Sequence, residues 1–250
     1  MSVRYRAIIS SDWNECLAPC GPFDCIAFSY PDIAAQLTDI FRQYTGNRIS
    51  LGDAVGKIQN MLPGLITPER MDAYLDKSFV AYTGVAELIE WSLSKNVLFL
   101  INTTGMIGYF QRVFARGLLP RVPVLSGHPM IRFPGCSSDP RDIYRVLEIR
   151  DKGKNTNSVI QAQKIPAQKT ILLGDSGGDG PHFEWGASAG AFLVGSMTKP
   201  SLDSYCREKD IFINLRFGLD YSRGGIANQE KEMQVNFMDL TTAIEEIIAG

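Results

Sequence analysis

The chain has 250 residues, of which 45% are hydrophobic and 21% are charged. This length and apolar content exclude a disordered chain and allow one sizeable α/β domain, alone or with a smaller insert. The 25 basic and 27 acidic residues leave a formal net charge of −2, which gives no reason to expect nucleic acid or an anionic membrane as a partner. No apolar stretch approaches the ~18 to 20 residues of a membrane span. No secretory signal is visible after Met1, so a cytoplasmic location is expected.

Four short apolar runs predict buried parallel strands. They cover residues 6–11, 97–101, 169–173 and 191–194, and each ends at a polar or glycine-rich turn. Runs of this kind are typical of strands that are covered on both faces of a sheet. The residues from Asn102 to Gly105 are expected to form the turn after the second run.

Helical patterns separate these strands. Apolar residues recur at helical spacing in residues 85–93 and 237–248, and residues 155–163 form a weaker helical stretch. Strands that alternate with helices imply an α/β fold, a three-layer sandwich around a doubly wound, Rossmann-like parallel sheet. In such sheets ligands bind at the carboxyl ends of the strands.

The segment between the first two predicted strands breaks this alternation. It contains helical patterns at residues 33–44, 51–61 and 68–79 and no clear strand pattern. We therefore expect a helical cap over residues 29–83, on a core domain made of residues 1–28 and 84–250. The alternative is that these helices pack on the sheet as part of one domain.

Acidic residues follow the first and third predicted strands. Asp12 lies in Ser-Ser-Asp-Trp-Asn-Glu-Cys, and Asp175 and Asp179 lie in Gly-Asp-Ser-Gly-Gly-Asp-Gly. Carboxylates gathered at one sheet edge raise each other's pKa unless a cation lies between them. A hard cation with oxygen ligands is the natural partner, and Mg²⁺ fits best if the substrate carries phosphate.

Two other residue types complete the pattern. A threonine, Thr103 or its neighbour Thr104, follows the second strand, and a lysine, Lys152 or Lys154, precedes the third. A single aspartate after a strand is more often a turn residue or a helix N-cap. The whole ordered set is much harder to obtain by chance.

In this order the residues resemble the four motifs of the haloacid dehalogenase superfamily, and in particular its phosphoserine phosphatase-like branch, which has a helical cap. The resemblance implies that Asp12 is the nucleophile, which attacks phosphorus and forms an aspartyl phosphate. It implies that Thr103 and Lys152 are catalytic residues that hold the transferring group, and that Thr104 and Gly105 bind the substrate.

The resemblance also implies a metal site and a class of partner. Mg²⁺ would be held by Asp12, the carbonyl oxygen of Asn14 and Asp175, while Asp179 would orient the waters of the metal or brace Lys152. The implied partner is a small phosphorylated metabolite, and the implied activity is hydrolysis of a phosphomonoester. The oligomeric state is not indicated.

Asn14 departs from the pattern of the family's phosphatases, which usually carry a second aspartate at this position. That aspartate ligates the metal through its carbonyl and acts as acid and base through its side chain. An amide keeps the first role and cannot keep the second, a loss that typically costs about 10²- to 10⁴-fold in rate. The adjacent Glu15 is a poor substitute, because its side chain should leave in another direction.

Several functions are compatible with this substitution. The chain is a phosphatase that uses good leaving groups or another acid, or it binds a phosphorylated ligand without turnover. A third reading is a branch enzyme that cleaves another bond, such as a phosphonatase or a dehalogenase. The metal-dependent motif set speaks against a dehalogenase.

Other polar residues have less definite readings. His182 follows the last motif and either faces the pocket as a proton donor or packs locally. Cys16, Cys20 and Cys25 are expected to be free thiols, with a zinc or redox role as the alternative. Three arginines follow the second motif, and one of them could reach the substrate; they are Arg112, Arg116 and Arg132.

Overall fold

The computed structural model describes residues 4–46 and 48–249. In this part of the chain seven parallel strands form one sheet, in the order β4-β3-β2-β1-β5-β6-β7. The strands are β1 (Ala7–Ser11), β2 (Val97–Met106), β3 (Val124–His128), β4 (Asp142–Arg145), β5 (Thr170–Gly174), β6 (Phe192–Ser196) and β7 (Leu215–Phe217). The central β1 pairs with β2 on one side and β5 on the other, which confirms the predicted doubly wound parallel sheet.

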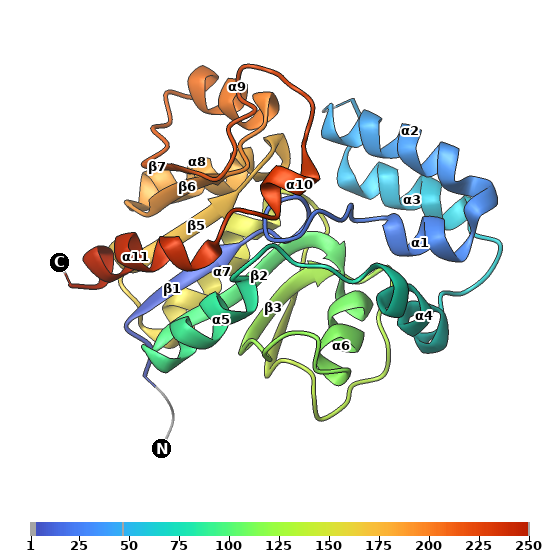
Figure 1. Ribbon diagram of the computed structural model, residues 1–250, viewed down its shortest axis with the longest axis horizontal. Coiled ribbons are helices and arrows are strands. Elements are labelled where there is room, and N and C mark those ends of the chain that lie inside the picture. The colour runs from blue at the N-terminus through green and yellow to red at the C-terminus, as the bar shows by residue number, and fades with distance from the viewer. Residues whose placement is uncertain (1–3, 47, 250) are drawn as a thin grey trace.

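Helices cover both faces of the sheet, so the core has three layers (Figure 1). One face packs against α5 (Val85–Ser94), α6 (Ile107–Ala115) and α11 (Leu240–Ala249). The other packs against α7 (Asp151–Gln163), α8 (Gly180–Ala189) and α9 (Pro200–Glu208). Along β1, Ala7 and Ile9 face the first hydrophobic cluster and Ile8 faces the second, as the alternation of side chains in a strand requires. No described helix has the length and apolar character needed to cross a membrane.

The structure differs from the sequence prediction at the sheet edges. The strands β3, β4 and β7 were not predicted, because β3 ends in Ser-Gly-His and the two outer strands are short and partly exposed. The strand β2 continues to Met106, whereas the prediction placed a turn after Ile101. An irregularity in its pairing with β3 lies between Asn102 and Met106, and such bulges often redirect side chains beside functional sites.

Short helices complete the chain. They are α10 (Gln229–Glu232), η1 (Pro31–Ile33), η2 (Ala167–Lys169), η3 (Gly177–Asp179) and η4 (Phe237–Asp239). The helix α7 begins at Asp151 rather than at the predicted Asn155. This earlier start places both candidate lysines in its first turn.

Four helices lie between β1 and α5 and form a layer beside the carboxyl edge of the sheet (Figure 1). They are α1 (Asp24–Ser29), α2 (Ala34–Thr45), α3 (Leu51–Met61) and α4 (Pro68–Ser78). Their positions agree with the three predicted helical patterns and add α1, which begins before residue 29. The division into a core of residues 1–28 and 84–250 and a cap of residues 29–83 remains a proposal, and we call α1–α4 the cap in that sense.

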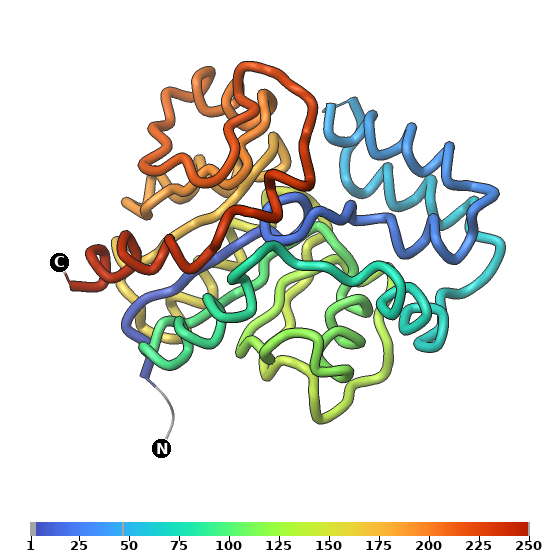
Figure 2. The backbone as a smooth tube through the Cα atoms, in the orientation of Figure 1, coloured from blue at the N-terminus to red at the C-terminus, as the bar shows by residue number. Residues whose placement is uncertain are grey.

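The two chain segments that connect the cap to the core lie side by side (Figure 2). The backbone N–H of Tyr82 on the returning segment donates to the carbonyl of Leu17 on the outgoing one, at 2.9 Å.

Candidate active site

Three carboxylates meet at the carboxyl edge of the sheet. Asp12 follows β1, Asp175 follows the adjacent β5, and Asp179 ends η3. All three are buried, and one ligand atom from each lies within 4.8 Å of the others. Gly174 permits this approach, because a Cβ at that position would lie 2.6 Å from the Cβ of Asp179. The structure therefore brings together the acidic residues that the two sequence motifs single out.

Lys152 joins two of these carboxylates. Its Nζ lies 3.0 Å from Asp12 Oδ2 and 2.7 Å from Asp179 Oδ1, and its side chain is 1% exposed. Burial lowers the pKa of Lys152, but the charges of Asp12 and Asp179 outweigh burial and raise that pKa above its usual value. Lys154 instead projects into solvent and pairs with Asp151. Between the two candidate lysines, the structure thus places Lys152 in the cluster.

Asp12 is held by contacts to both of its oxygens. Oδ1 accepts a hydrogen bond from the Trp13 N–H at 2.7 Å, while Oδ2 faces Lys152. Burial raises the pKa of Asp12 and the charge of Lys152 opposes that rise. The lysine therefore favours the ionised carboxylate, the form that can attack an electrophile.

Asp175 is the least satisfied group of the cluster. Neither of its buried oxygens accepts a hydrogen bond within the described part of the protein. Lys199 Nζ lies 2.8 Å from Oδ2 as an ion pair without hydrogen-bond geometry, and burial raises the pKa of Asp175 well above its usual range. A buried carboxylate with unused oxygens requires an explanation. A hard cation with oxygen ligands fits this donor set, so the residues present fit the magnesium that the sequence motifs imply.

The amide of Asn14 takes part in a short chain of hydrogen bonds. Its Oδ1 accepts from Thr103 Oγ1 at 3.2 Å, and its Nδ2 donates to the carbonyl of Cys20 at 3.1 Å. Gly105 donates its N–H to the same threonine oxygen, and a Cβ on Gly105 would lie 2.8 Å from Asn14 Oδ1. These partners suit an amide, because a carboxylate here would face the Cys20 carbonyl oxygen without a proton between them.

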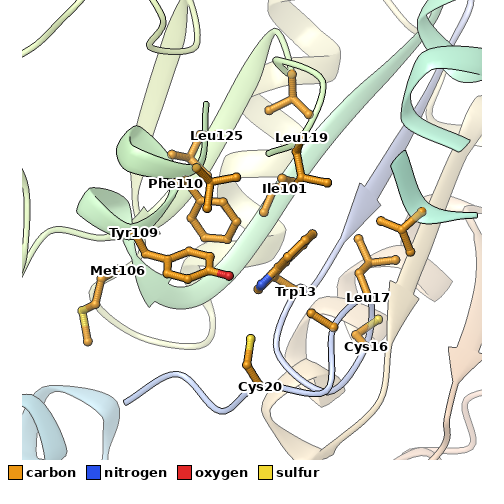
Figure 3. Close-up of a cluster of buried hydrophobic side chains, with 14 of the residues drawn as sticks. Trp13, Cys16, Leu17, Cys20, Ile101, Met106, Tyr109, Phe110, Leu119 and Leu125 are labelled. Atoms are coloured by element: carbon orange, nitrogen blue, oxygen red, sulfur yellow. The ribbon is translucent and has the colours of Figure 1, made fainter. Parts of the chain in front are cut away.

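The loop that carries Asp12 and Asn14 is anchored by Trp13. Its indole is fully buried against Phe110 and Tyr109 of α6, with ring centroids 5.5 and 6.5 Å away (Figure 3). Burial of a tryptophan side chain provides a large hydrophobic stabilisation. This anchor fixes the backbone on both sides of Trp13 and hence the direction of the Asp12 side chain.

The cap and the core together line a small cavity above these groups. From the core it is lined by Asp12, Asn14, Glu15, Thr104, Ile149, Lys152, Ser176 and Gly178, and from the chain that leads into and through the cap by Pro22, Phe41, Tyr44 and Thr45. The cavity measures about 30 Å³, which is room for one or two water molecules. No spacing pattern in the sequence pointed to the residues of α2, because their position depends on how the cap folds over the core.

Lys199 is a second residue that the sequence did not reveal. It precedes α9, and its backbone N–H donates to the Asp175 carbonyl at 2.8 Å, while its Nζ also contacts Glu15 Oε2 at 2.5 Å. Glu15 adopts a left-handed conformation with φ of 59°. This turn directs the Glu15 side chain to Lys199, so the glutamate is engaged in an ion pair.

His182 lies beneath the site rather than in the cavity. It is fully buried, its Nε2 lies 3.0 Å from Thr156 Oγ1, and its ring stacks near Trp185. Burial lowers the pKa of His182 to about 3. The reading in which this residue packs locally is therefore the one that agrees with the structure.

Two of the three arginines after the second motif contact the cap, whereas Arg132 is exposed. Arg112 forms two hydrogen bonds of 2.8 Å with Asp72 of α4, and Arg116 pairs with Asp76 of the same helix. These ion pairs tie α4 to α6. Neither arginine lines the cavity, so this part of the structure offers no arginine from α6 to a ligand.

The cysteines agree with free thiols. Cys16, Cys20 and Cys25 are buried and unpaired in the described structure. Burial raises the pKa of each of the three thiols. Within the described residues they do not form a cluster able to hold a metal ion, and the alternative of a zinc site is not supported.

The backbone is similar to that of several solved structures. A phospho-aspartyl intermediate analogue of phosphoserine phosphatase matches with a TM-score of 0.67 at 14% identity, covering 96% of this chain and 99% of that one. A substrate-bound phosphoserine phosphatase complex matches with a TM-score of 0.67 at 14% identity, covering 95% and 98% of the two chains. A HAD family hydrolase from Salmonella enterica subsp. enterica serovar Typhi matches with a TM-score of 0.62 at 16% identity, covering 98% of this chain and 73% of that one.

The similarity is confined to structure. No family model matches the sequence, and neither does any curated protein. Identities of 14–16% carry information on the fold rather than on the reaction. The matched part, which is 96% of this chain, shares its fold with the phosphoserine phosphatase structure and is haloacid dehalogenase-like.

Proposed function

We propose that this protein is a Mg²⁺-dependent phosphatase that hydrolyses a small phosphomonoester through an aspartyl phosphate on Asp12. The observation that carries the proposal is the buried cluster in which Asp12 and Asp179 share Lys152, while neither oxygen of Asp175 accepts a hydrogen bond within the described residues. A nucleophile, a fixed positive charge and a cation site are what phosphoryl transfer requires. The fold shared with phosphoserine phosphatase structures supports the same reaction class.

Each residue of the cluster has a role in this proposal. Asp12 attacks phosphorus, and Lys152 holds the phosphoryl oxygens beside it. Thr104 lines the cavity and is placed to donate to the same group, while Thr103 supports the loop through Asn14. Mg²⁺, held by Asp12, the Asn14 carbonyl and Asp175, would offset the negative charge of the phosphoryl group.

The small volume of the cavity limits how a substrate can enter. A volume of about 30 Å³ is far below the size of a phosphorylated metabolite. We therefore expect the cap to open for binding and release and to close during the reaction, which excludes bulk water from the phosphoryl group.

The test is release of inorganic phosphate, with Mg²⁺, from a panel that includes phosphoserine, p-nitrophenyl phosphate and sugar phosphates. We expect release by the wild type and a loss of at least about 10³-fold in Asp12→Asn, which keeps the shape and removes the nucleophile. EDTA should abolish release and added Mg²⁺ should restore it. The matched control is Asp142→Asn, an exposed aspartate on β4 that pairs with Arg141.

A second function is favoured by Asn14, whose amide is hydrogen-bonded on both sides. In this alternative the chain binds a phosphorylated ligand and does not turn it over. A rise in melting temperature with phosphate and Mg²⁺ but no release from any ester would favour it. Release from a phosphonate and not from esters would instead indicate a branch enzyme that cleaves another bond to phosphorus.

A further inference from the structure

The proposed phosphatase leaves one chemical requirement without an assigned residue. When phosphorus is transferred to Asp12, the leaving oxygen must gain a proton unless it is already a stable anion. The amide of Asn14 has no proton of suitable acidity, and it is occupied by Thr103 and Cys20. The proton must therefore come from another group that faces the cavity.

Tyr44 is in the right region of the structure. It lies in the last turn of α2, its side chain is 7% exposed, and it lines the cavity together with Asp12 and Lys152. Its Oη lies 3.6 Å from the point where a Cβ on Gly178 would be, so the phenol reaches from the cap down to the loop after β5. In an in-line attack the leaving group departs on the side away from Asp12, and the cap covers that side.

Two other acidic or hydroxyl groups of the cavity wall already have hydrogen-bond or ion-pair partners. Glu15 is paired with Lys199. Thr45 donates its hydroxyl proton to the carbonyl of Phe41 within α2, at 2.9 Å. Neither side chain is therefore free to give a proton to a leaving group.

The remaining candidates on the wall are less suitable. Thr104 and Ser176 carry aliphatic hydroxyls, which are much weaker acids than a phenol. Lys152 is held by two carboxylates that stabilise its charged form. Tyr44 therefore supplies the phenolic hydroxyl of the described cavity wall.

We infer that Tyr44 is the acid for the leaving group in this reaction, and the inference rests on the proposed phosphatase function. An Asp12 oxygen forms a bond to phosphorus, the bond from phosphorus to the leaving oxygen breaks, and that oxygen takes the Tyr44 proton. The products are an alcohol, the aspartyl phosphate and a tyrosinate. Water then forms a bond to phosphorus, the bond to Asp12 breaks, and Tyr44 recovers its proton from that water.

The surroundings of Tyr44 suit both halves of this cycle. Burial raises the pKa of Tyr44, so the phenol stays protonated at neutral pH before the reaction. The charges of Asp12 and Asp179 also raise this pKa, while the charge of Lys152 and a hydrogen bond with Thr104 lower it. Lys152 and Thr104 therefore stabilise the tyrosinate once it has formed.

The test compares Tyr44→Phe with the wild type on three probes whose leaving groups differ in acidity. These are propyl phosphate, phenyl phosphate and p-nitrophenyl phosphate. We expect a loss in kcat/KM of about 10²-fold or more for propyl phosphate, a smaller loss for phenyl phosphate and little change for p-nitrophenyl phosphate, whose leaving group needs no proton. A graded loss of this kind does not arise from a merely structural role.

The matched control is Thr45→Val, which removes a hydroxyl from the same helix and cavity. It should change the three probes equally or not at all. Tyr44→Phe with an equal loss on all three probes, or with no loss, overturns the inference while the phosphatase function stands. A wild type that releases no phosphate from the probes, or an Asp12→Asn variant that still does, removes the proposed function and the inference with it.

Discussion

Two lysines contact the carboxylates of the site, and they differ in burial and in the partners they have. Lys152 is 1% exposed and lies between Asp12 and Asp179, whose side chains are themselves buried. Lys199 is 27% exposed and pairs with the buried Asp175 and with Glu15, whose side chain is 36% exposed. Of the two lysines that contact the cluster, Lys152 is therefore buried and Lys199 is partly hydrated.

The difference in burial determines which lysine can leave its carboxylate partners. Removing water from a charge is costly, so a buried ion pair is stable only when its partners are close. Removing one partner leaves the other charge buried and uncompensated. A lysine that is 27% exposed regains hydration when it leaves its partner, so a stronger cation can displace it. In the proposed phosphatase, Lys152 would be a permanent part of the site, and Lys199 would cover Asp175 until a metal ion binds.

Lys152→Met should produce the largest effect. Phosphate release should fall by about 10³-fold, because the phosphoryl group loses its fixed positive charge. The free energy of unfolding should fall by about 3–5 kcal/mol, since Asp12 and Asp179 stay buried without a cation. Urea denaturation and phosphate release measure the two effects. An unchanged stability would show that the contacts of Lys152 do not hold the cluster together.

The free energy of unfolding of Lys152→Met should depend on pH differently from that of the wild type. Lys152 lowers the pKa of Asp12, so its removal raises that pKa further above the value in the unfolded chain. A raised pKa in the folded state stabilises the fold at low pH and loses that effect as the pH rises through it. The stability lost in Lys152→Met should therefore be smaller at about pH 5 than at about pH 8. Urea denaturation at both pH values tests the sign.

Lys199→Met should have a smaller effect that depends on the metal. Without Mg²⁺ we expect a loss of about 2 kcal/mol, the scale of one hydrogen bond to a charged group. Mg²⁺ should raise the melting temperature of the variant more than that of the wild type, because Asp175 no longer has a competing cation. Thermal unfolding with and without MgCl₂ measures this difference.

The control for Lys199→Met is Lys209→Met, which changes an exposed lysine just after α9. Its response to Mg²⁺ should equal that of the wild type. If Mg²⁺ stabilises Lys199→Met less than the wild type, then Lys199 supports the metal site rather than competing for it.

The contrast between the lysines also shows which parts of the site the sequence could predict. The sequence narrows the lysine to Lys152 or Lys154, before the third predicted strand, and the strand ends place Asp12 and Asp175 at adjacent positions on one edge. Lys199 lies beyond the next strand, and its contact depends on how the backbone after β6 turns back to Asp175. Tyr44 depends on the fold of the cap, which no local pattern in the sequence determines.

The strands likewise divide into those that a local sequence pattern predicts and those that it does not. The central strands are continuous apolar runs, because they are buried on both faces, and they could be predicted. The edge strand β4 and the three-residue β7 are partly exposed and polar, so they have no apolar run to detect. The helix α7 was predicted too short because its first turn, from Asp151, is polar and carries two lysines.

Lys154→Met should have the smallest effect of the series and decides between the two lysines of α7. Residues two positions apart on a helix point in directions about 200° apart, so one lysine faces the cluster and the other faces water. Lys154 is 74% exposed and pairs with Asp151, and such surface pairs contribute about 0–1 kcal/mol. Stability and phosphate release should therefore stay close to wild-type values in the assays used for Lys152→Met. A large loss of activity in Lys154→Met with an active Lys152→Met would reverse the assignment, and it would mean that α7 begins later in solution than at Asp151.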